Sequence, residues 1–355
     1  MIIGITGYGC TGASAVIDLL QEFEDVQSYR SSVEFQVLQQ PDGILDLHYH
    51  VVEAGRRLSN NVAIKRFIRN INSPGTGQIR RFTNNQYEYL SMEYIRKIIQ
   101  IQWKGKSAFD PPDLRLFYDT LRLKLFNKVV NKCLNMISKK MAWPPKGMRY
   151  FAMLDEHSFV KITREYIRDL LNASGFDLNK PIILEQLFNT SEPLAGVEYV
   201  DEPISIIVDR DPRDVYLLMN HYYSRGTSFM PDTGDVEQFI TYYKNLHRKV
   251  VEDPRVIYVQ FEDLIYDYNK TCEKIEIIMQ GRKHIHKGQR FKPECSINNT
   301  MLYQKFPQYS DEIKKIEEEL SEYLYPFEEK RKQINFVAAD VGMFDRQVEV
   351  KKKLD

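Results

Sequence analysis

The 355-residue sequence has no excess of charge of either sign, because 49 Lys and Arg residues balance 49 Asp and Glu residues. A net charge of zero gives the protein no overall field that would attract nucleic acid or an anionic membrane. We therefore expect no nucleic-acid partner, and any site for an anion has to be built locally.

Cysteine is scarce, and long apolar runs are missing. The four cysteines, Cys10, Cys133, Cys272 and Cys295, lie far apart and form no CxxC pair, which argues against a zinc site or a redox pair. We expect reduced thiols and no metal. No apolar run approaches the ~20 residues that span a bilayer, and the opening MIIGITG lacks the basic start and cleavage region of a signal peptide. These absences predict a cytoplasmic protein without a transmembrane segment.

The chain has enough hydrophobic residues, 43%, to bury a substantial core. Short apolar runs at 2–6, 182–184, 204–208 and 256–259 read as strands, and helical patterns at 13–20, 161–173, 215–223 and 236–251 separate them. This alternation predicts an α/β fold of three layers, with a mostly parallel central sheet. Such sheets bind ligands beyond the carboxyl ends of their strands.

We expect one α/β domain over residues 1–355, with two additions. From about 41 to 145 the sequence is polar, aromatic and basic, without a clear buried strand, which indicates a helical insertion. It includes helical stretches at 61–71 and 87–100 and a long amphipathic pattern at 114–141. A second helical region covers about 300–355, with its strongest pattern at 310–325.

A glycine-rich loop follows the first strand and opens the first helix, as in a phosphate-loop unit. It can be parsed as a dinucleotide fingerprint on Gly7, Gly9 and Gly12, or as a phosphate loop from Gly7 to Ser14. Both parses direct backbone N–H groups and a helix N-terminus at an anion. The alternative is a tight turn that binds nothing. The candidate binding residues are Gly7, Gly9, Cys10, Thr11, Gly12, Ala13 and Ser14.

Two nucleotide-binding classes fit this loop only in part. An NADP-binding oxidoreductase would use Arg30 for a 2′-phosphate, but it needs further apolar strands soon after the loop, and residues 40–110 offer none. A kinase-like phosphoryl transferase would have lysine where Ala13 stands, and its nearest magnesium-binding aspartate is Asp209.

Two later segments, ISIIVDRDPRDVY at 204–216 and VIYVQFEDL at 256–264, resemble the sulfotransferases that use 3′-phosphoadenosine-5′-phosphosulfate (PAPS). The resemblance is to bacterial carbohydrate-type members with a phosphate-loop-like fold. It implies that Arg210 binds the donor's 3′-phosphate and that no metal is needed. Residues 291–299 resemble the late donor-binding loop of this family, which implies donor contacts from Ser296, Asn298 and Asn299.

The loop YGCTGAS resembles the family's 5′-phosphosulfate loop, with Thr11, Gly12 and Ser14 in agreement. It departs from the pattern at Cys10, where the family has a lysine that neutralises the leaving phosphate. Leu218 also departs, because it replaces a serine expected eight residues after the phosphate arginine. The departures leave three possibilities: another cation substitutes, the reaction is slow, or the protein binds its nucleotide without catalysis.

The catalytic base is expected at Glu34, because SVEFQVLQQPDGILDL at 32–47 resembles the glutamate-containing segment of heparan-type sulfotransferases. A solvated strand glutamate is the alternative reading. His48 and His50 are rival bases, because histidine is the side chain that ordinarily exchanges a proton near neutral pH.

The sequence gives little indication of which molecule accepts the transferred group. Aromatic faces that stack on sugars and basic groups that attract an anionic polymer are present at Arg56, Arg57, Arg80, Arg81, Tyr87, Tyr89 and Trp103. The resemblance implies a saccharide hydroxyl as acceptor and PAPS as donor. The competing hypothesis is a catalytically weak or inactive nucleotide-binding protein of the same fold.

Overall fold

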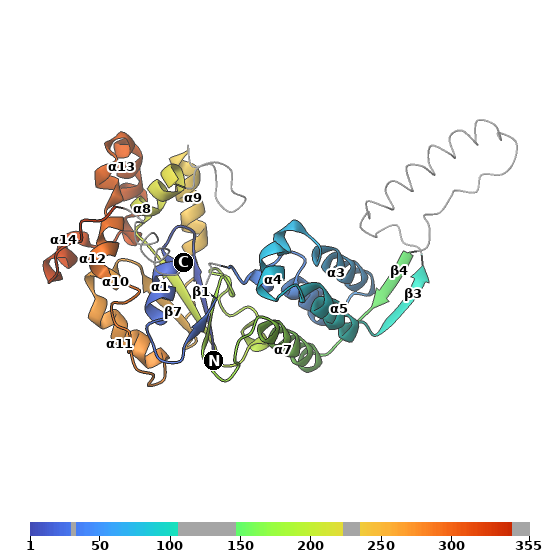
Figure 1. Cartoon of the computed structure of the whole chain (residues 1–355). Helices are drawn as coiled ribbons and strands as arrows, with labels where there is room; N and C mark the ends of the chain where they lie inside the picture. Colours follow the sequence, from blue (N-terminus) through green and yellow to red (C-terminus); the bar gives the residue numbers. More distant parts are fainter. Residues whose placement is uncertain (30–32, 106–146, 223–234, 343–355) are drawn as a thin grey trace, which may run out of the picture. The chain divides into compact units, whose positions relative to one another are not determined.

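The computed structural model describes residues 1–29, 33–105, 147–222 and 235–342 (Figure 1). The chain divides into two compact units: unit 1 comprises Met1–Gln36 with Gly175–Asp355, and unit 2 comprises Val37–Ser174. The single domain with an insertion at 41–145 stays a prediction. The amphipathic pattern at 114–141 lies outside the described residues.

Unit 1 contains a five-stranded parallel sheet in the order β2-β5-β1-β6-β7. The strands are β1 (Ile2–Gly7), β2 (Gln27–Ser28), β5 (Ile182–Glu185), β6 (Pro203–Asp209) and β7 (Val256–Gln260). This sheet confirms the predicted α/β class. The phosphate-loop type and the insertion stay predictions.

The central strands alternate between two apolar environments, as a strand buried on both faces requires. Ile206 and Val208 pack into one large hydrophobic cluster, whereas Ile207 between them packs into another with Tyr8. Gly4 of β1 meets Phe188, where an added Cβ would lie 2.5 Å from the ring. The register from Ile2↔Pro203 to Gly7↔Val208 brings the ends of β1 and β6 to the same edge.

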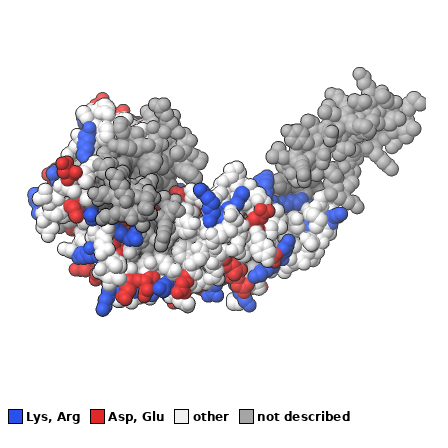
Figure 2. Space-filling view, viewed as in Figure 1, with Lys and Arg blue, Asp and Glu red and all other residues white. Residues whose placement is uncertain are grey.

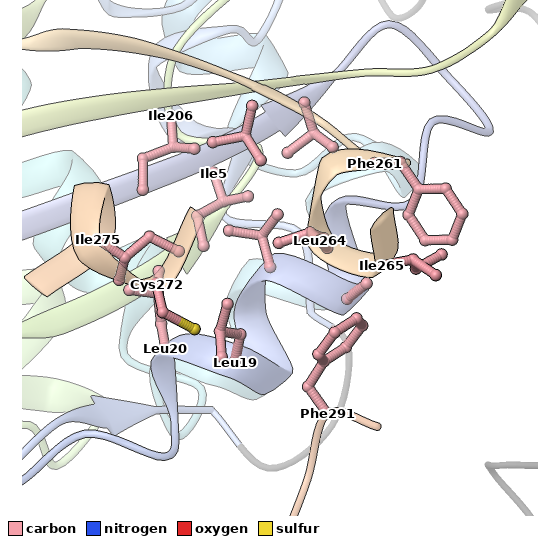
Figure 3. Packing of buried hydrophobic residues seen from close by; sticks show 14 of the residues in the cluster. Ile5, Leu19, Leu20, Ile206, Phe261, Leu264, Ile265, Cys272, Ile275 and Phe291 are labelled. Carbon is pink, nitrogen blue, oxygen red and sulfur yellow. The ribbon is translucent and has the colours of Figure 1, made fainter. Parts of the chain in front are cut away.

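The first of these clusters packs helices α1 (Ala13–Leu20), α10 (Asp263–Tyr266) and α11 (Tyr268–Ile278) on one face of the sheet (Figure 3). In that view, Leu19 and Leu20 of α1 and Ile275 of α11 surround Ile5 of β1. The helices of unit 1 are α1 (Ala13–Leu20), α8 (Pro212–Leu217), α9 (Val236–His247), α10 (Asp263–Tyr266), α11 (Tyr268–Ile278), α12 (Pro293–Ser296), α13 (Ser310–Glu319) and α14 (Phe327–Lys330).

Helix α8 begins directly after β6 because the sequence supplies both of its start signals. The Asp211 side chain accepts a hydrogen bond from the Arg213 N–H, and Pro212 occupies the first helical position. A π-helical turn, Leu218–Tyr222, then continues the chain. Leu218, at the position of the expected serine, is buried in the cluster that α8 forms with α9 and α13.

The described residues of unit 2 are mainly helical. They form α2 (Ile44–His48), α3 (Arg57–Asn70), α4 (Gly77–Phe82), α5 (Tyr87–Ile98) and α7 (Glu156–Ala173), and a π-helical turn, Tyr49–Glu53, follows α2. Helices α5 and α7 join through stacked Tyr94 and Tyr166 rings, 4.4 Å between centroids, and a 2.7 Å hydrogen bond between the Ser91 and Tyr166 hydroxyls. An antiparallel hairpin of β3 (Ile101–Gly105) and β4 (Gly147–Phe151) completes the described part.

Basic and acidic side chains are interspersed on the face shown in Figure 2, in keeping with the balanced composition. No helix within the described ranges is long and apolar enough to cross a membrane.

Candidate functional site

The loop between β1 and α1 has an unusual backbone. Gly9 (φ 97°), Cys10 (φ 56°) and Gly12 (φ 86°) all adopt left-handed conformations, which glycine takes readily and other residues rarely. Turns of this kind gather backbone N–H groups into an anion-binding concavity. Gly12 is the N-cap of α1 and offers no side chain to its first turn, so the N-cap residue leaves those N–H groups to other partners.

Close packing fixes the loop in this form. An added Cβ at Gly7 would lie 2.1 Å from Thr11 Oγ1, and one at Gly12 would lie 2.6 Å from the Phe261 ring. Thr11 Oγ1 is buried and has no hydrogen-bond partner within the described part of the chain. Burial raises the pKa of the Cys10 thiol to about 11, despite the opposing charge of Arg210, so this thiol is neutral near pH 7.

Tyr8 anchors the other side of the loop. Its ring stacks on His247 of α9 at 3.9 Å between centroids, and the opposite face of His247 stacks on Tyr243, also at 3.9 Å. His247 Nε2 lies 3.1 Å from Asp209 Oδ1 at the end of β6. Burial, reinforced by the charge of Asp209, raises the pKa of Tyr8, so Tyr8 stays uncharged and serves as an apolar anchor.

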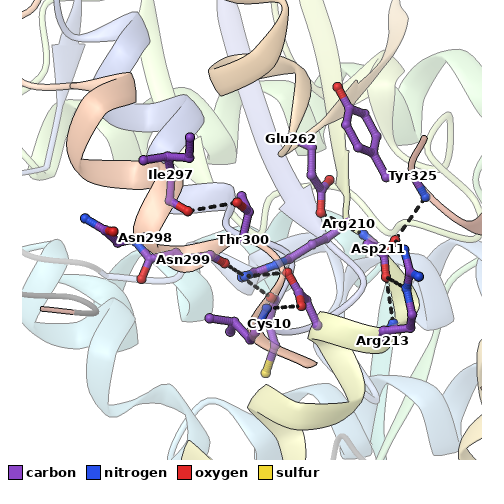
Figure 4. Close-up of polar contacts among 12 residues, drawn as sticks. Cys10, Arg210, Asp211, Arg213, Glu262, Ile297, Asn298, Asn299, Thr300 and Tyr325 are labelled. Carbon is purple, nitrogen blue, oxygen red and sulfur yellow. Dashed lines mark hydrogen bonds and ion pairs between the residues drawn. The ribbon is translucent and has the colours of Figure 1, made fainter. Parts of the chain in front are cut away.

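Arg210 connects the glycine loop to the late loop (Figure 4). It follows β6 directly, is 2% exposed, and lies over the Phe261 ring at 4.6 Å from the centroid. Nη1 donates to the Cys10 carbonyl at 3.4 Å, and Nη2 donates to the Asn299 carbonyl. Its ion pair with Asp214 is long, 3.6 Å. The structure therefore brings together Arg210, Cys10 and Asn299, three of the residues expected to bind the donor.

Arg213 is held differently, by a buried pair with Asp211. Nε and Nη2 donate to the Asp211 carboxylate at 2.9 and 2.7 Å, and Nη1 donates to Glu317 at 2.8 Å. The guanidinium also lies over Tyr303, 4.1 Å from the ring centroid. Because these partners lie at the start of α8, on α13 and in the segment of Tyr303, Arg213 holds these three segments together.

Two further carboxyl groups are buried beside Arg210. Burial raises the pKa of Asp214 to about 6 and that of Glu262, which follows β7, to about 8. Glu262 Oε1 accepts a hydrogen bond from the Asp211 N–H at 3.0 Å. Glu262 therefore carries a proton near pH 7. Because it is then uncharged, it does not repel an anion at the loop.

The late loop comprises the end of α12 and the 3₁₀ turn Ile297–Asn299. Ser296 is buried, Asn298 Nδ2 donates to the Ala339 carbonyl at 2.8 Å, and Asn299 Oδ1 is buried without a partner within the described ranges. Asn299 thus contacts Arg210 through its carbonyl, whereas the Asn298 side-chain amide is occupied by its hydrogen bond to Ala339.

Glu34 lies at the same sheet edge, beside a residue that the sequence analysis missed. An isolated parallel bridge pairs it with Glu185 at the end of β5, and Gln36 Nε2 donates to Glu34 Oε2 at 2.6 Å. Burial, reinforced by the charge of Glu34, raises the pKa of Glu185. Glu185 directly follows the apolar run at 182–184. This position at the end of a buried strand could have identified it as a candidate site residue.

The two rival bases belong to unit 2, whereas Glu34 belongs to unit 1. His48 lies between two carboxylates, with Nδ1 3.4 Å from Glu53 and Nε2 2.8 Å from Glu156. His50 Nδ1 is buried and has no partner among the described residues. These histidines are part of the packing around α2.

The residues proposed for acceptor binding have mixed environments. Arg80 donates to Thr76 and to the Ser73 carbonyl, and the buried Tyr87 hydroxyl donates to Gln40 at 3.1 Å. The remaining members of the set are exposed: Arg56, Arg57, Arg81, Tyr89 and Trp103.

In the described ranges, no group of three or more His, Cys, Asp or Glu side chains is arranged to hold a metal ion. The described cysteines, Cys10, Cys272 and Cys295, are free thiols. None of the family models, curated proteins or solved structures matches the chain.

Proposed function

We propose that this protein is a sulfotransferase that transfers a sulfuryl group from PAPS to a hydroxyl of a saccharide. The observation that carries the proposal is the meeting of the left-handed glycine loop with a buried arginine at the carboxyl ends of β1 and β6. A loop of N–H groups and a guanidinium are the groups that bind phosphate and sulfate esters. The proposal includes a cytoplasmic location, which the free thiols support.

The sheet order supports a nucleotide site at this place. From β1 the chain continues to β2 and β5 on one side, and β6 and β7 lie on the other. Ligands of open α/β sheets bind where the strand order reverses in this way. The order also argues against the NADP-binding alternative, because a dinucleotide fold pairs its first strand with its second, whereas β2 pairs here with β5.

The kinase-like alternative needs an aspartate that is free to hold magnesium. Asp209 Oδ1 instead lies within hydrogen-bond distance of His247 Nε2, the Tyr243 hydroxyl and the Arg210 N–H, at 3.1, 3.3 and 2.8 Å. These contacts occupy Oδ1 of Asp209, whose side chain is half-buried near the loop. We therefore favour sulfuryl transfer over a magnesium-dependent reaction.

In the proposed reaction the acceptor oxygen forms a bond to sulfur while the bond from sulfur to the phosphate oxygen breaks. The hydroxyl proton passes to Glu34, and the products are a sulfate ester and adenosine 3′,5′-bisphosphate. The protein's part is to align the reacting groups and to stabilise the spreading negative charge. The loop N–H groups and Thr11 would hold the 5′-phosphosulfate.

A second candidate is a nucleotide-binding protein with little or no turnover. It is favoured by the Cys10 thiol, which is neutral near pH 7 and cannot replace the charge of a lysine at that position. Binding of the nucleotide and transfer of the sulfuryl group therefore need separate measurements.

The nucleotide class can be tested by thermal stabilisation of the whole chain. At 100 times its dissociation constant, a ligand stabilises the folded state by about 2.7 kcal/mol, a shift of roughly 2–4 °C per kcal/mol for a protein of this size. We expect such a shift with adenosine 3′,5′-bisphosphate and a much smaller one with equal concentrations of ATP, NADP or adenosine. Equal stabilisation by ATP would contradict the proposal.

A further inference from the structure

Arg210 and Arg213 lie three residues apart but differ in what neutralises them. Two carboxylates, those of Asp211 and Glu317, accept hydrogen bonds from the Arg213 guanidinium at 2.7–2.9 Å. The acceptors of Arg210 are the uncharged backbone carbonyls of Cys10 and Asn299, and its Asp214 partner lies at 3.6 Å, beyond hydrogen-bond distance. Arg210 is therefore balanced by one buried carboxylate that does not hydrogen-bond to it, and its N–H groups are directed at the glycine loop and at Asn299.

Unsatisfied polar atoms belong to Arg210 and to the two loops that it contacts. Arg210 Nε, Thr11 Oγ1 and Asn299 Oδ1 are all buried without a hydrogen-bond partner in the part of the chain that the structure describes. Thr11 belongs to the glycine loop and Asn299 to the late loop, and Arg210 hydrogen-bonds to the backbone of both loops (Figure 4). Because buried polar atoms in native proteins are nearly always paired, this grouping indicates a place where a polar ligand binds.

We propose that Arg210 is the cation of the glycine loop and neutralises the 5′-phosphosulfate held at residues 7–14. This is the task that a lysine at position 10 performs in the sulfotransferase pattern, and it differs from the 3′-phosphate role that the resemblance implies for Arg210. The identity of the anion rests on the proposed function. Through the hydrogen bond from Nη1 to the Cys10 carbonyl, the guanidinium contacts the backbone of residue 10, the residue that is a lysine in the sulfotransferase pattern.

Phe261 makes this arrangement rigid. Its ring packs under the Arg210 guanidinium, 4.6 Å from the centroid, and also fills the space beside Gly12, where an added Cβ would meet it at 2.6 Å. One side chain thus fixes both the cation and the end of the loop. A positive charge held in a buried position by stacking acts on an anion with less screening than an exposed lysine would.

Two nucleotides that differ only in the 3′-phosphate can test the assignment. Calorimetric titration would measure the affinity of adenosine 5′-phosphate and adenosine 3′,5′-bisphosphate for the wild type and for Arg210→Gln. If Arg210 acts on the 5′ side, the substitution weakens both ligands by the same factor, about 10- to 150-fold. Loss confined to the bisphosphate would return Arg210 to the 3′-phosphate and overturn the inference. Arg255→Gln, which removes an exposed arginine of unit 1, is the control and should change neither affinity.

Rescue of the charge separates an electrostatic role from a structural one. In the Arg210→Gln background, Cys10→Lys should recover at least tenfold in affinity for adenosine 5′-phosphate, because it restores a cation at the loop. Absence of any recovery would show that Arg210 only shapes the loop. If circular dichroism shows that Arg210→Gln does not fold, Arg210→Met, which also lacks the charge, replaces it, and the comparison between the two ligands decides as before.

Pyrophosphate and ATP distinguish this inference from the proposed function. If the wild type binds ATP as tightly as the bisphosphate, the sulfotransferase proposal fails, and an equal loss of all nucleotides in Arg210→Gln still supports the loop cation. If only inorganic pyrophosphate binds, its loss in Arg210→Gln supports the inference, and its retention refutes it. If none of these anions binds to the wild type, both proposals fail.

Discussion

Glu262 accepts a hydrogen bond from the backbone N–H of Asp211 at 3.0 Å, so acidic residues that follow two neighbouring strands lie together in the interior. Both side chains are 0% exposed. Two carboxylates in such a place are tolerated only if they are paired or protonated. Asp211 is paired with Arg213, whereas Glu262 is kept protonated by burial, which raises its pKa to about 8.

We predict that this carboxyl group makes the protein less stable as the pH rises from about 5 to 8. The folded state keeps the Glu262 proton up to pH 8, but the unfolded chain loses it near the ordinary glutamate pKa, about 4.3. The unfolded state then binds fewer protons, so the free energy of unfolding falls with pH. Asp214, with its pKa raised to about 6, acts in the same direction at lower pH. The groups that face Glu262 are Arg210, Asp211 and Asp214.

Denaturant unfolding at pH 6 and pH 8 checks this prediction. Glu262→Gln imitates the protonated form and should flatten the dependence on pH, while Glu252→Gln, at an exposed position, should leave it unchanged. A Glu262→Gln protein with the same slope as the wild type would show that other groups control the dependence.

A second prediction concerns Glu22, which fixes a loop more than 260 residues away in the sequence. Its buried carboxylate lies 2.7 Å from His284 Nε2 and accepts hydrogen bonds from the N–H groups of Gly288, Arg290 and Phe291 at 2.7–3.1 Å. Glu22→Gln replaces one accepting oxygen by an NH₂ group that cannot accept from these donors. We therefore expect the free energy of unfolding to fall by about 2 kcal/mol or more. The melting temperature should fall by several degrees. Glu24→Gln, two residues further on and exposed, is the matched control. Equal melting temperatures would mean that the contacts contribute little.

A third prediction uses two glycines with nearly the same backbone. Gly12 (φ 86°) and Gly175 (φ 85°) share the left-handed conformation, but only at Gly12 does an added Cβ collide with a side chain, Phe261. Gly175→Ala should cost only the backbone strain, about 1 kcal/mol, and Gly12→Ala about 1–3 kcal/mol more. Chemical denaturation gives both values. Phe261→Leu should relieve part of the Gly12→Ala cost in a double-mutant cycle, and purely additive effects would refute the collision.

The main strands could be predicted from the sequence because they are short apolar runs. Expected strands at 182–184, 204–208 and 256–259 agree with β5, β6 and β7 to within a residue at each end. The two-residue strand β2 was missed, since Gln27 and Ser28 are polar and half-buried. The β3–β4 hairpin was missed because four residues of β3 are exposed and supply no alternation toward a core.

The candidate site was predictable only where its residues directly follow a glycine motif or a strand. The loop and Arg210 met that condition. The burial of Glu22, Asp214 and Glu262 could not be predicted, because an acidic side chain is stable in the interior only when partners from distant segments surround it. Asp214, for example, accepts a hydrogen bond from the N–H of Leu302, 88 residues later.

The end of helix α13 differs from the prediction. The helical pattern extends to residue 325, but the helix ends at Glu319, because Leu320 is buried in the core with a non-helical backbone.

The position of β1 in the middle of the sheet has a consequence for the order of folding during synthesis. Ile2 pairs with Ile182 on one side and Pro203 on the other, so both neighbours of the first strand are translated much later. At roughly 5–20 residues per second, the ribosome needs about 10–40 s to reach them. During that interval the apolar strand β1 has no partner in its own sheet, and the whole of Val37–Ser174 is made before the interval ends. Pairing over such separations is slow, and chaperones that bind exposed apolar segments have their longest opportunity at this strand.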